Sequence, residues 1–200
     1  MHVPVLTAAQ SARRDRLEID AGTPSLELMR RAGECAARVV TERLPSECTP
    51  GVSIFVGAGN NGGDGWIVAR DLLGRGLRVA VHVVAPPGTS DARAAASLVD
   101  VARLAEIGAP GVVIDALLGT GAHGPPRDDI SAAFTHIARL REHGAVVVSL
   151  DIPSGVDAAL DDRKEGLGMG WCGERENGAG PERGIRYRSY GGGPPGAQPL

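Results

Sequence analysis

Apolar residues recur along the first three quarters of this chain in two alternating patterns. Short runs of branched aliphatic residues predict buried strands, and apolar positions three or four residues apart predict helices. The predicted strands are residues 52–56, 78–84, 111–118 and 145–150. The predicted helices are residues 8–19, 24–44, 65–73, 91–107 and 130–143. Such apolar strands are typical of a parallel sheet covered on both faces. The pattern predicts an α/β fold: a doubly wound, mostly parallel, Rossmann-like sheet in three α/β/α layers, preceded by two helices.

Capping residues mark the starts of the first two helices. Thr7 and Gln10 have the spacing of a capping box. Thr23 offers a second N-cap, with Pro24 at the first helical position. Pro45 then breaks the second helix before the first strand begins.

The composition changes near residue 158. No valine follows Val156, 11 of the 29 glycines lie in residues 161–200, and no apolar period is visible there. Such a segment lacks the apolar surface that offsets ordering entropy. We therefore expect one domain over residues 1–158 and a disordered Gly/Pro/Arg-rich tail over 159–200. We interpret the tail as an out-of-frame or truncated continuation; a genuine disordered tail is the alternative.

Composition and charge restrict the class of protein. The hydrophobic content of 42% and the charged content of 22% are ordinary for a globular domain. The net charge of −3, without a basic block, argues against nucleic acid or an anionic membrane as partner. Cys35, Cys48 and Cys172 lack the spacing of a disulfide framework or a zinc site. No apolar run suits a signal peptide or a membrane span, so we expect a cytoplasmic protein.

Three predicted strands end in polar, glycine-rich sequence, and such ends should meet at one edge of a parallel sheet. The first segment, residues 57–65, has five glycines in nine positions, which lets the backbone approach a ligand closely. The following helix start can bind phosphate. Asn60, Asn61 and Asp64 are the informative side chains, although turn formation alone would also explain them.

The same segment contains a G-x-G-x-x-G match that suggests a nicotinamide-dependent oxidoreductase. That fold needs an acidic residue at the end of the next strand to bind the ribose. The position holds Val84, Ala85 and Pro86, which counts against this alternative.

The other two segments each bring a carboxylate to the same edge. Asp115 interrupts an apolar strand, and a buried carboxylate needs a cation, a hydrogen-bonded ligand or nearby backbone N–H groups. His123, further along this segment, is more typical of a loop residue than of a catalyst. Asp151 directly follows the last strand and could act as an acid, a base or a hydroxyl ligand. Ser154 offers a ligand oxygen or, alternatively, a turn or cap.

Together these motifs resemble the YjeF N-terminal domain, a family of NAD(P)H-hydrate epimerases. The matching segments are V-G-A-G-N-N-G-G-D-G at residues 56–65, D-A-L-L-G-T-G at 115–121 and D-I-P-S-G-V-D at 151–157. Residues 25–29 and 32–33 also resemble the family's second helix. The resemblance covers about residues 5–158.

The resemblance implies a substrate site and a potassium site. Asn61, Asp115 and Ser154 would bind a potassium ion, and their hard oxygen donors suit such a cation. Asp151 would contact the substrate, and we take it as the group that transfers a proton. The substrate-binding residues implied by the resemblance are Asn60, Asn61, Gly62, Gly63, Asp64, Gly119, Thr120, Gly121, Ala122, His123, Gly124, Pro125 and Asp151.

The implied reaction interconverts the R and S epimers of hydrated NADH or NADPH. Breaking a bond at the carbon between the hydroxyl and the ring nitrogen makes that carbon planar, and re-addition from the other face inverts it. The family's functional partner would be a separate NAD(P)H-hydrate dehydratase, and the chain itself could form a homodimer. The family's last two strands and its F-G-x-x-K-x-G segment have no counterpart after residue 158. An inactive ligand-binding or protein-interaction module is therefore kept as an alternative.

Overall fold

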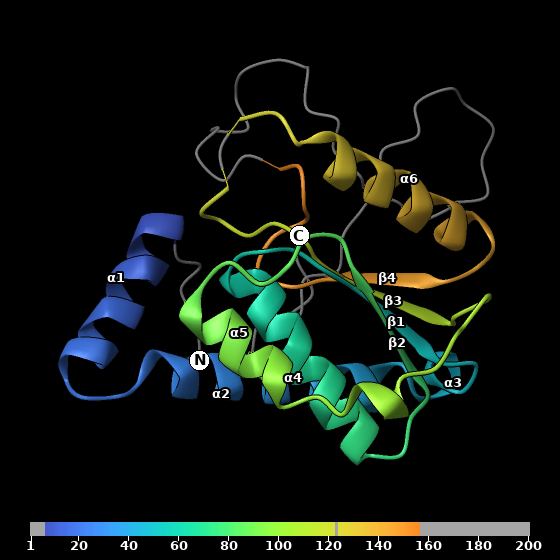
Figure 1. Ribbon diagram of the computed structural model, residues 1–200, viewed down its shortest axis with the longest axis horizontal. Coiled ribbons are helices and arrows are strands. Elements are labelled where there is room, and N and C mark those ends of the chain that lie inside the picture. The colour runs from blue at the N-terminus through green and yellow to red at the C-terminus, as the bar shows by residue number, and fades with distance from the viewer. Residues whose placement is uncertain (1–6, 123, 157–200) are drawn as a thin grey trace, which may run out of the picture.

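The computed structural model describes residues 7–122 and 124–156, which form a four-stranded parallel sheet with helices on both faces (Figure 1). The strand order is β2-β1-β3-β4. The strands are β1 (Val52–Val56), β2 (Val79–Val83), β3 (Val112–Ala116) and β4 (Val146–Ser149). Since all three pairings are parallel, every strand ends at the same edge of the sheet. The predicted α/β fold is confirmed.

The helices divide between the two faces of the sheet (Figure 1). Helices α2 (Ser25–Arg43), α4 (Asn60–Gly74) and α5 (Ser90–Ser97) lie on one side, and α6 (Asp128–Glu142) covers the other. The remaining helical elements are α1 (Ala8–Asp20), α3 (Pro45–Cys48) and the 3₁₀ turn η1 (Val101–Arg103). Helix α1 has no buried residue and stands apart from the body of the fold, beside α2.

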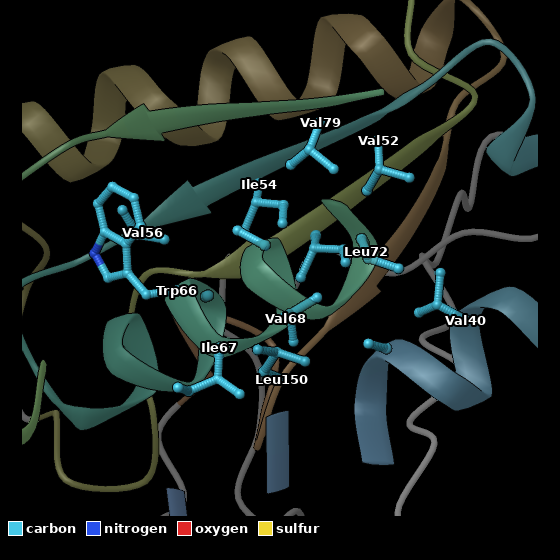
Figure 2. Packing of buried hydrophobic residues seen from close by; sticks show 14 of the residues in the cluster. Val40, Val52, Ile54, Val56, Trp66, Ile67, Val68, Leu72, Val79 and Leu150 are labelled. Carbon is cyan, nitrogen blue, oxygen red and sulfur yellow. The ribbon is translucent and has the colours of Figure 1, made fainter. Parts of the chain in front are cut away.

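Two hydrophobic clusters fill the two sides of the sheet. Val52, Ile54 and Val56 of β1 pack against the apolar side of α4, as Figure 2 shows. Phe55, from the same strand, points into the second cluster beneath α6, with Val113 as a neighbour. Because successive strand residues face opposite sides and both sides are covered, the strand has no exposed position. This burial explains the unbroken apolar runs in the sequence.

Helix α4 begins five residues earlier than the sequence predicts, at Asn60 instead of residue 65. Its first two turns are rich in glycine, a poor helix former, so local propensity favours a loop there. The packing requires these glycines: a Cβ on Gly62 would lie 2.0 Å from the carbonyl oxygen of Gly57, and one on Gly65 would lie 2.7 Å from Cβ of Ala116. Tertiary contact between helix and sheet therefore overrides propensity.

The helix predicted over residues 91–107 is also different, because α5 ends at Ser97. The Asp100 side chain accepts a hydrogen bond from the Ala102 N–H (3.1 Å) and starts the short 3₁₀ turn. The Ala105 N–H then donates to the carbonyl of Val79 (2.8 Å), so the chain already runs beside the sheet there.

The helix starts agree with the predictions in one case and differ in another. The capping box of α1 is present: the Gln10 N–H donates to Thr7 Oγ1 and the Thr7 N–H to Gln10 Oε1. The N-cap of α2 is Pro24, not Thr23, and it makes no side-chain hydrogen bond. Helix α3 was not predicted; it starts with Pro45.

Several predictions fall outside the described residues. They are the disordered tail over 159–200, the missing last strands of the family and the place of His123. Among residues 7–122 and 124–156, no helix combines the length and the hydropathy that a bilayer crossing requires.

Candidate functional site

A cavity of about 1040 Å³ lies at the edge of the sheet where the strands end. The three glycine-rich segments supply one part of its wall, and α1 and α2 contribute another. The expected site residues that line it are Asn60, Asn61, Asp64, Gly119, Thr120, Gly121, Ala122, Gly124, Pro125 and Asp151. Gly62 and Gly63 are buried behind this wall, against Gly57 and Met29. The structure thus brings together residues up to 91 positions apart in the sequence, from Asn60 to Asp151.

Asp115 lies behind the cavity wall and is almost fully buried, at 4% exposure. Its Oδ1 accepts hydrogen bonds from the Leu117 N–H (3.2 Å) and Ser154 Oγ (2.6 Å). Its Oδ2 accepts from Ser149 Oγ (3.2 Å) and the Ser154 N–H (3.0 Å). Burial raises the pKa of Asp115, and the bonds from Ser154, Leu117 and Ser149 oppose that shift. The carboxylate thereby ties the end of β3 to the segment after β4.

The other two expected cation ligands meet Asp115 around the backbone of Leu118. Ser154 Oγ accepts a hydrogen bond from the Leu118 N–H (2.9 Å) and lies 3.2 Å from the Leu118 carbonyl oxygen. The Asn61 side-chain amide donates to that same carbonyl (3.0 Å). Asn61 Oδ1 is buried and has no hydrogen-bond partner in the described part of the chain. An unpartnered buried oxygen beside a buried carboxylate and a hydroxyl is a donor set that suits a hard cation.

Asp151 joins the third segment to the second. Its Oδ2 accepts a hydrogen bond from the Thr120 N–H (2.7 Å), and a Cβ on Gly119 would lie only 2.6 Å from that oxygen. Asp151 has a φ of 62°, the left-handed region that Asp and Asn enter more readily than other side chains. This backbone turn holds an exposed carboxylate at the mouth of the cavity.

Asp64 is the third carboxylate of the site and the least engaged. It lies in the second turn of α4, is partly buried and lines the cavity. The pKa of Asp64 is raised to about 7, first by burial and then by the negative charges of Asp151 and Asp15. Among the described residues, none donates a hydrogen bond to its carboxylate or forms an ion pair with it.

Sequence reasoning missed several residues that take part in this site. Ser149 is paired with Asp115 across the β3–β4 register, and its polar character in an apolar strand was a usable signal. Thr89 Oγ1 donates to Asn60 Oδ1 (2.7 Å) and lines the cavity. Asp15 reaches the cavity from α1, and nothing in its local sequence marks it.

Comparison of the sequence with known proteins identifies relatives of this chain. The family profile described as "YjeF-related protein N-terminus" matches residues 25–166. The chain is 32% identical over 182 residues to the NAD(P)H-hydrate epimerase of Rhodobacter capsulatus, with 82% of each chain covered. It is 33% identical over 153 residues to the bifunctional NAD(P)H-hydrate repair enzyme Nnr of Coxiella burnetii. That match covers 72% of this chain but only 30% of the Coxiella protein, so the chain spans about a third of such bifunctional relatives.

A solved structure shares the fold. The crystal structure of yeast ynu0, YNL200c, superposes with a TM-score of 0.66 and covers 77% of this chain and 72% of the yeast chain. Sequence identity is 21%, so this likeness supports the architecture alone.

Proposed function

The chain belongs to the YjeF-related N-terminal family, as its motifs suggested, and on that premise we propose that it is an NAD(P)H-hydrate epimerase. Such an isomerase interconverts the R and S epimers of hydrated NADH or NADPH. The observation that carries the proposal is the cavity, because all three glycine-rich segments contribute to it and the carboxylates of Asp15, Asp64 and Asp151 line it. The relative named as an epimerase, from Rhodobacter capsulatus, matches over most of its own length.

The site offers what the reaction needs. Epimerisation at the carbon that bears the hydroxyl requires proton transfer at that hydroxyl and a pocket that holds the ring. The first turn of α4 has no side-chain cap, so its backbone N–H groups remain available for the negatively charged phosphates of a dinucleotide. The residues we assign to substrate binding are those listed above as lining the cavity, together with Gly62, Gly63 and His123 of the family motifs.

We also assign a potassium ion to Asn61, Asp115 and Ser154. The unpartnered Oδ1 of Asn61 supports this assignment, because a buried amide oxygen without a partner is costly. Asp115 is already saturated with hydrogen bonds, but Ser154 Oγ has a second acceptor in the Leu118 carbonyl. When the hydroxyl turns to that carbonyl, an oxygen of Asp115 becomes free to bind a cation. A bound ion supplies a fixed positive charge behind the wall that holds the dinucleotide.

A second enzyme must use the epimer that this reaction forms. In our proposal a separate NAD(P)H-hydrate dehydratase uses one of the two epimers, both proteins act in the cytoplasm, and the epimerase works as a homodimer. The name of the bifunctional relatives, a repair enzyme for NAD(P)H hydrates, agrees with two linked repair steps.

A coupled assay tests the function. Purified protein is mixed with R-enriched NADPH hydrate and an excess of a dehydratase specific for the S epimer, and regenerated NADPH is followed by absorbance. We expect a rate well above spontaneous epimerisation, and an equal rate for Asp71→Asn, whose carboxylate pairs with Arg75 outside the cavity. A rate no higher than the spontaneous one would contradict the proposal. If calorimetry then still detected dinucleotide binding, the inactive ligand-binding alternative would replace it.

A further inference from the structure

The three carboxylates that the glycine-rich segments contribute differ in how their oxygens are hydrogen-bonded. Asp115 accepts four hydrogen bonds, Asp151 accepts one from the Thr120 N–H, and Asp64 accepts none from the described residues. A carboxylate held by several donors stays ionised or serves structure, whereas one without donors exchanges its proton at low cost. Asp15 of α1 also lines the cavity without a donor among the described residues, but it is exposed to solvent. Among the carboxylates of the glycine-rich segments, Asp64 is therefore the one that is free to give or take a proton.

Among the described residues, Asp64 has negative charges nearby and forms no ion pair. Arg127, which lines the same cavity, pairs instead with Asp129. Asp151 faces it from the segment after β4 and Asp15 from α1. Helix α2 packs against the same turn of α4 through Gly33, where a Cβ would lie 3.0 Å from the Asp64 carbonyl oxygen. The charged residues of α2 that face α4 pair with one another and with an arginine of α4. These ion pairs involve Glu27, Arg30, Arg31, Glu34 and Arg70.

Two carboxylates in one cavity with separate environments are a common arrangement for acid–base chemistry. Burial and the charges of Asp151 and Asp15 raise the pKa of Asp64 to about 7, so that near neutral pH it is present in both protonation states. A proton-transfer group is most effective when its pKa lies near the working pH. Asp151 differs from Asp64 in its environment, because it is exposed and accepts a hydrogen bond from the Thr120 N–H.

We propose that Asp64 is the general acid of the epimerisation and that Asp151 is the general base, an inference that rests on the proposed function. The Asp64 carboxyl donates its proton to the hydroxyl oxygen as the C–O bond breaks. The electron pair of that bond leaves with the oxygen as water, and the ring nitrogen lone pair forms the C=N bond.

A water molecule then adds to the planar carbon from the other face, and its extra proton passes to the Asp151 carboxylate. Proton exchange between the two carboxyl groups through water in the open cavity restores the starting state. No net proton, electron or water is consumed. In the reverse direction the two residues exchange roles.

The experiment compares Asp64→Asn with the parent and with Asp71→Asn, a control on the same helix. We expect Asp64→Asn to lower kcat by about 100-fold or more while dinucleotide affinity changes by less than about threefold. Asp64→Glu should recover part of the lost rate, which a packing role alone would not produce. In the parent, kcat should fall as pH rises above 7, because the acid is then deprotonated.

A carboxyl titration followed by ¹³C NMR adds a measurement that does not depend on turnover. The parent should show an aspartate titration near pH 7 that is absent in Asp64→Asn and shifted to lower pH in Asp151→Asn. Near-parental kcat in Asp64→Asn, or an Asp64 titration at the ordinary aspartate value, would overturn the inference and leave the epimerase proposal intact. An inactive parent would overturn the function first, and the inference with it.

Discussion

The edge of the sheet where the strands begin and the edge where they end differ in how their polar groups are hydrogen-bonded. At the edge where the strands begin, the backbone polar groups are paired: the Val52 N–H donates to the Arg78 carbonyl, the Gly111 N–H to Gly51 and the Val146 N–H to Gly111. The Arg78 guanidinium there donates to two further carbonyls. Near this edge the buried Ser53 Oγ, one residue into β1, has no hydrogen-bond partner among the described residues, but these backbone groups are paired.

At the edge where the strands end, polar groups are left incomplete. Within the part of the chain that the structure describes, Asn61 Oδ1 has no partner and the Asp64 carboxylate has no donor, and Asp151 has a positive φ. Helix α4 starts there without a side-chain cap. Unsatisfied groups and strain cost stability, and folded proteins concentrate such costs at functional sites. The free helix start, the positive φ of Asp151 and the carboxylates therefore agree with a functional site at the edge where the strands end.

The largest effect that separates the edges should come from Asp151→Asn. Asparagine tolerates a positive φ and its oxygen can still accept the Thr120 N–H, so the fold should remain within about 1 kcal/mol of the parent. Without an ionisable carboxylate, epimerisation should fall by about 100-fold or more. The coupled assay and a chemical denaturation curve measure the two effects separately. Turnover near the parental rate would remove Asp151 from the catalytic pair.

The second effect concerns stability and its dependence on pH. Asp64 has a folded-state pKa of about 7, above the ordinary aspartate value, so the folded chain binds the proton more tightly than the unfolded chain. Its contribution to stability is complete below about pH 4 and is lost as the pH rises to about 7. Asp64→Asn should therefore be more stable than the parent at pH 8, on the order of 2–4 kcal/mol after allowance for solvent screening.

Urea denaturation of both chains at pH 4 and pH 8 checks the sign of this effect. The two stabilities should agree at pH 4 within about 1 kcal/mol, since Asp64 is protonated in the folded state and about half protonated in the unfolded state there. A parent that is more stable than Asp64→Asn at pH 8 would show that the carboxylate has a stabilising partner. This result would contradict the view that polar groups at this edge are left unsatisfied.

The third effect tests the cation. Asp115→Asn should weaken dinucleotide binding about tenfold and abolish any stabilisation of the protein by potassium chloride, because it removes the charge of the expected ligand set. Calorimetry and thermal unfolding measure these quantities, with choline chloride as the matched salt. Unchanged affinity in the variant, together with a parent indifferent to potassium, would show that Asp115 acts only through its hydrogen bonds.

The smallest effect should come from the opposite edge. Arg78 is exposed, and its bonds to the carbonyls of Pro50 and Glu106 are long, at 3.3 and 3.4 Å. Arg78→Ala should lower the free energy of unfolding by about 1 kcal/mol or less and leave turnover unchanged. A loss of activity without a loss of stability in this variant would mean that the edges are coupled.

The sequence predicted the sheet well because each strand is a short apolar run buried on both faces. It misplaced the start of α4 because the reason for Gly62 and Gly65 is a contact with Gly57 and Ala116, which local propensity does not contain. It extended α5 too far because apolar residues near Val101 continue the helical spacing, while Asp100 ends it by binding the backbone.

The sequence predicted the three segments of the candidate site, but it did not predict the residues that lie outside these segments. Asp115 and Asp151 were identified because each interrupts or ends an apolar strand. Ser149 carried the same signal in a weaker form, and its partner became visible only through the strand register. Asp15 could not be found, since its place at the cavity depends on how α1 lies beside α2. The raised pKa of Asp64 was equally hidden, because it arises from burial and from two distant carboxylates.

The close contact between α2 and α4 should make the two helices move together. Cβ atoms on Gly33 and Gly63 would both meet side chains at 2.6 Å, those of Ile67 and Met29, so little deformable material separates the two backbones there. A ligand that draws the first turn of α4 toward itself must carry α2 along. We therefore expect slower amide hydrogen exchange along α2 when the cavity is filled, including at residues of α2 that do not line the cavity.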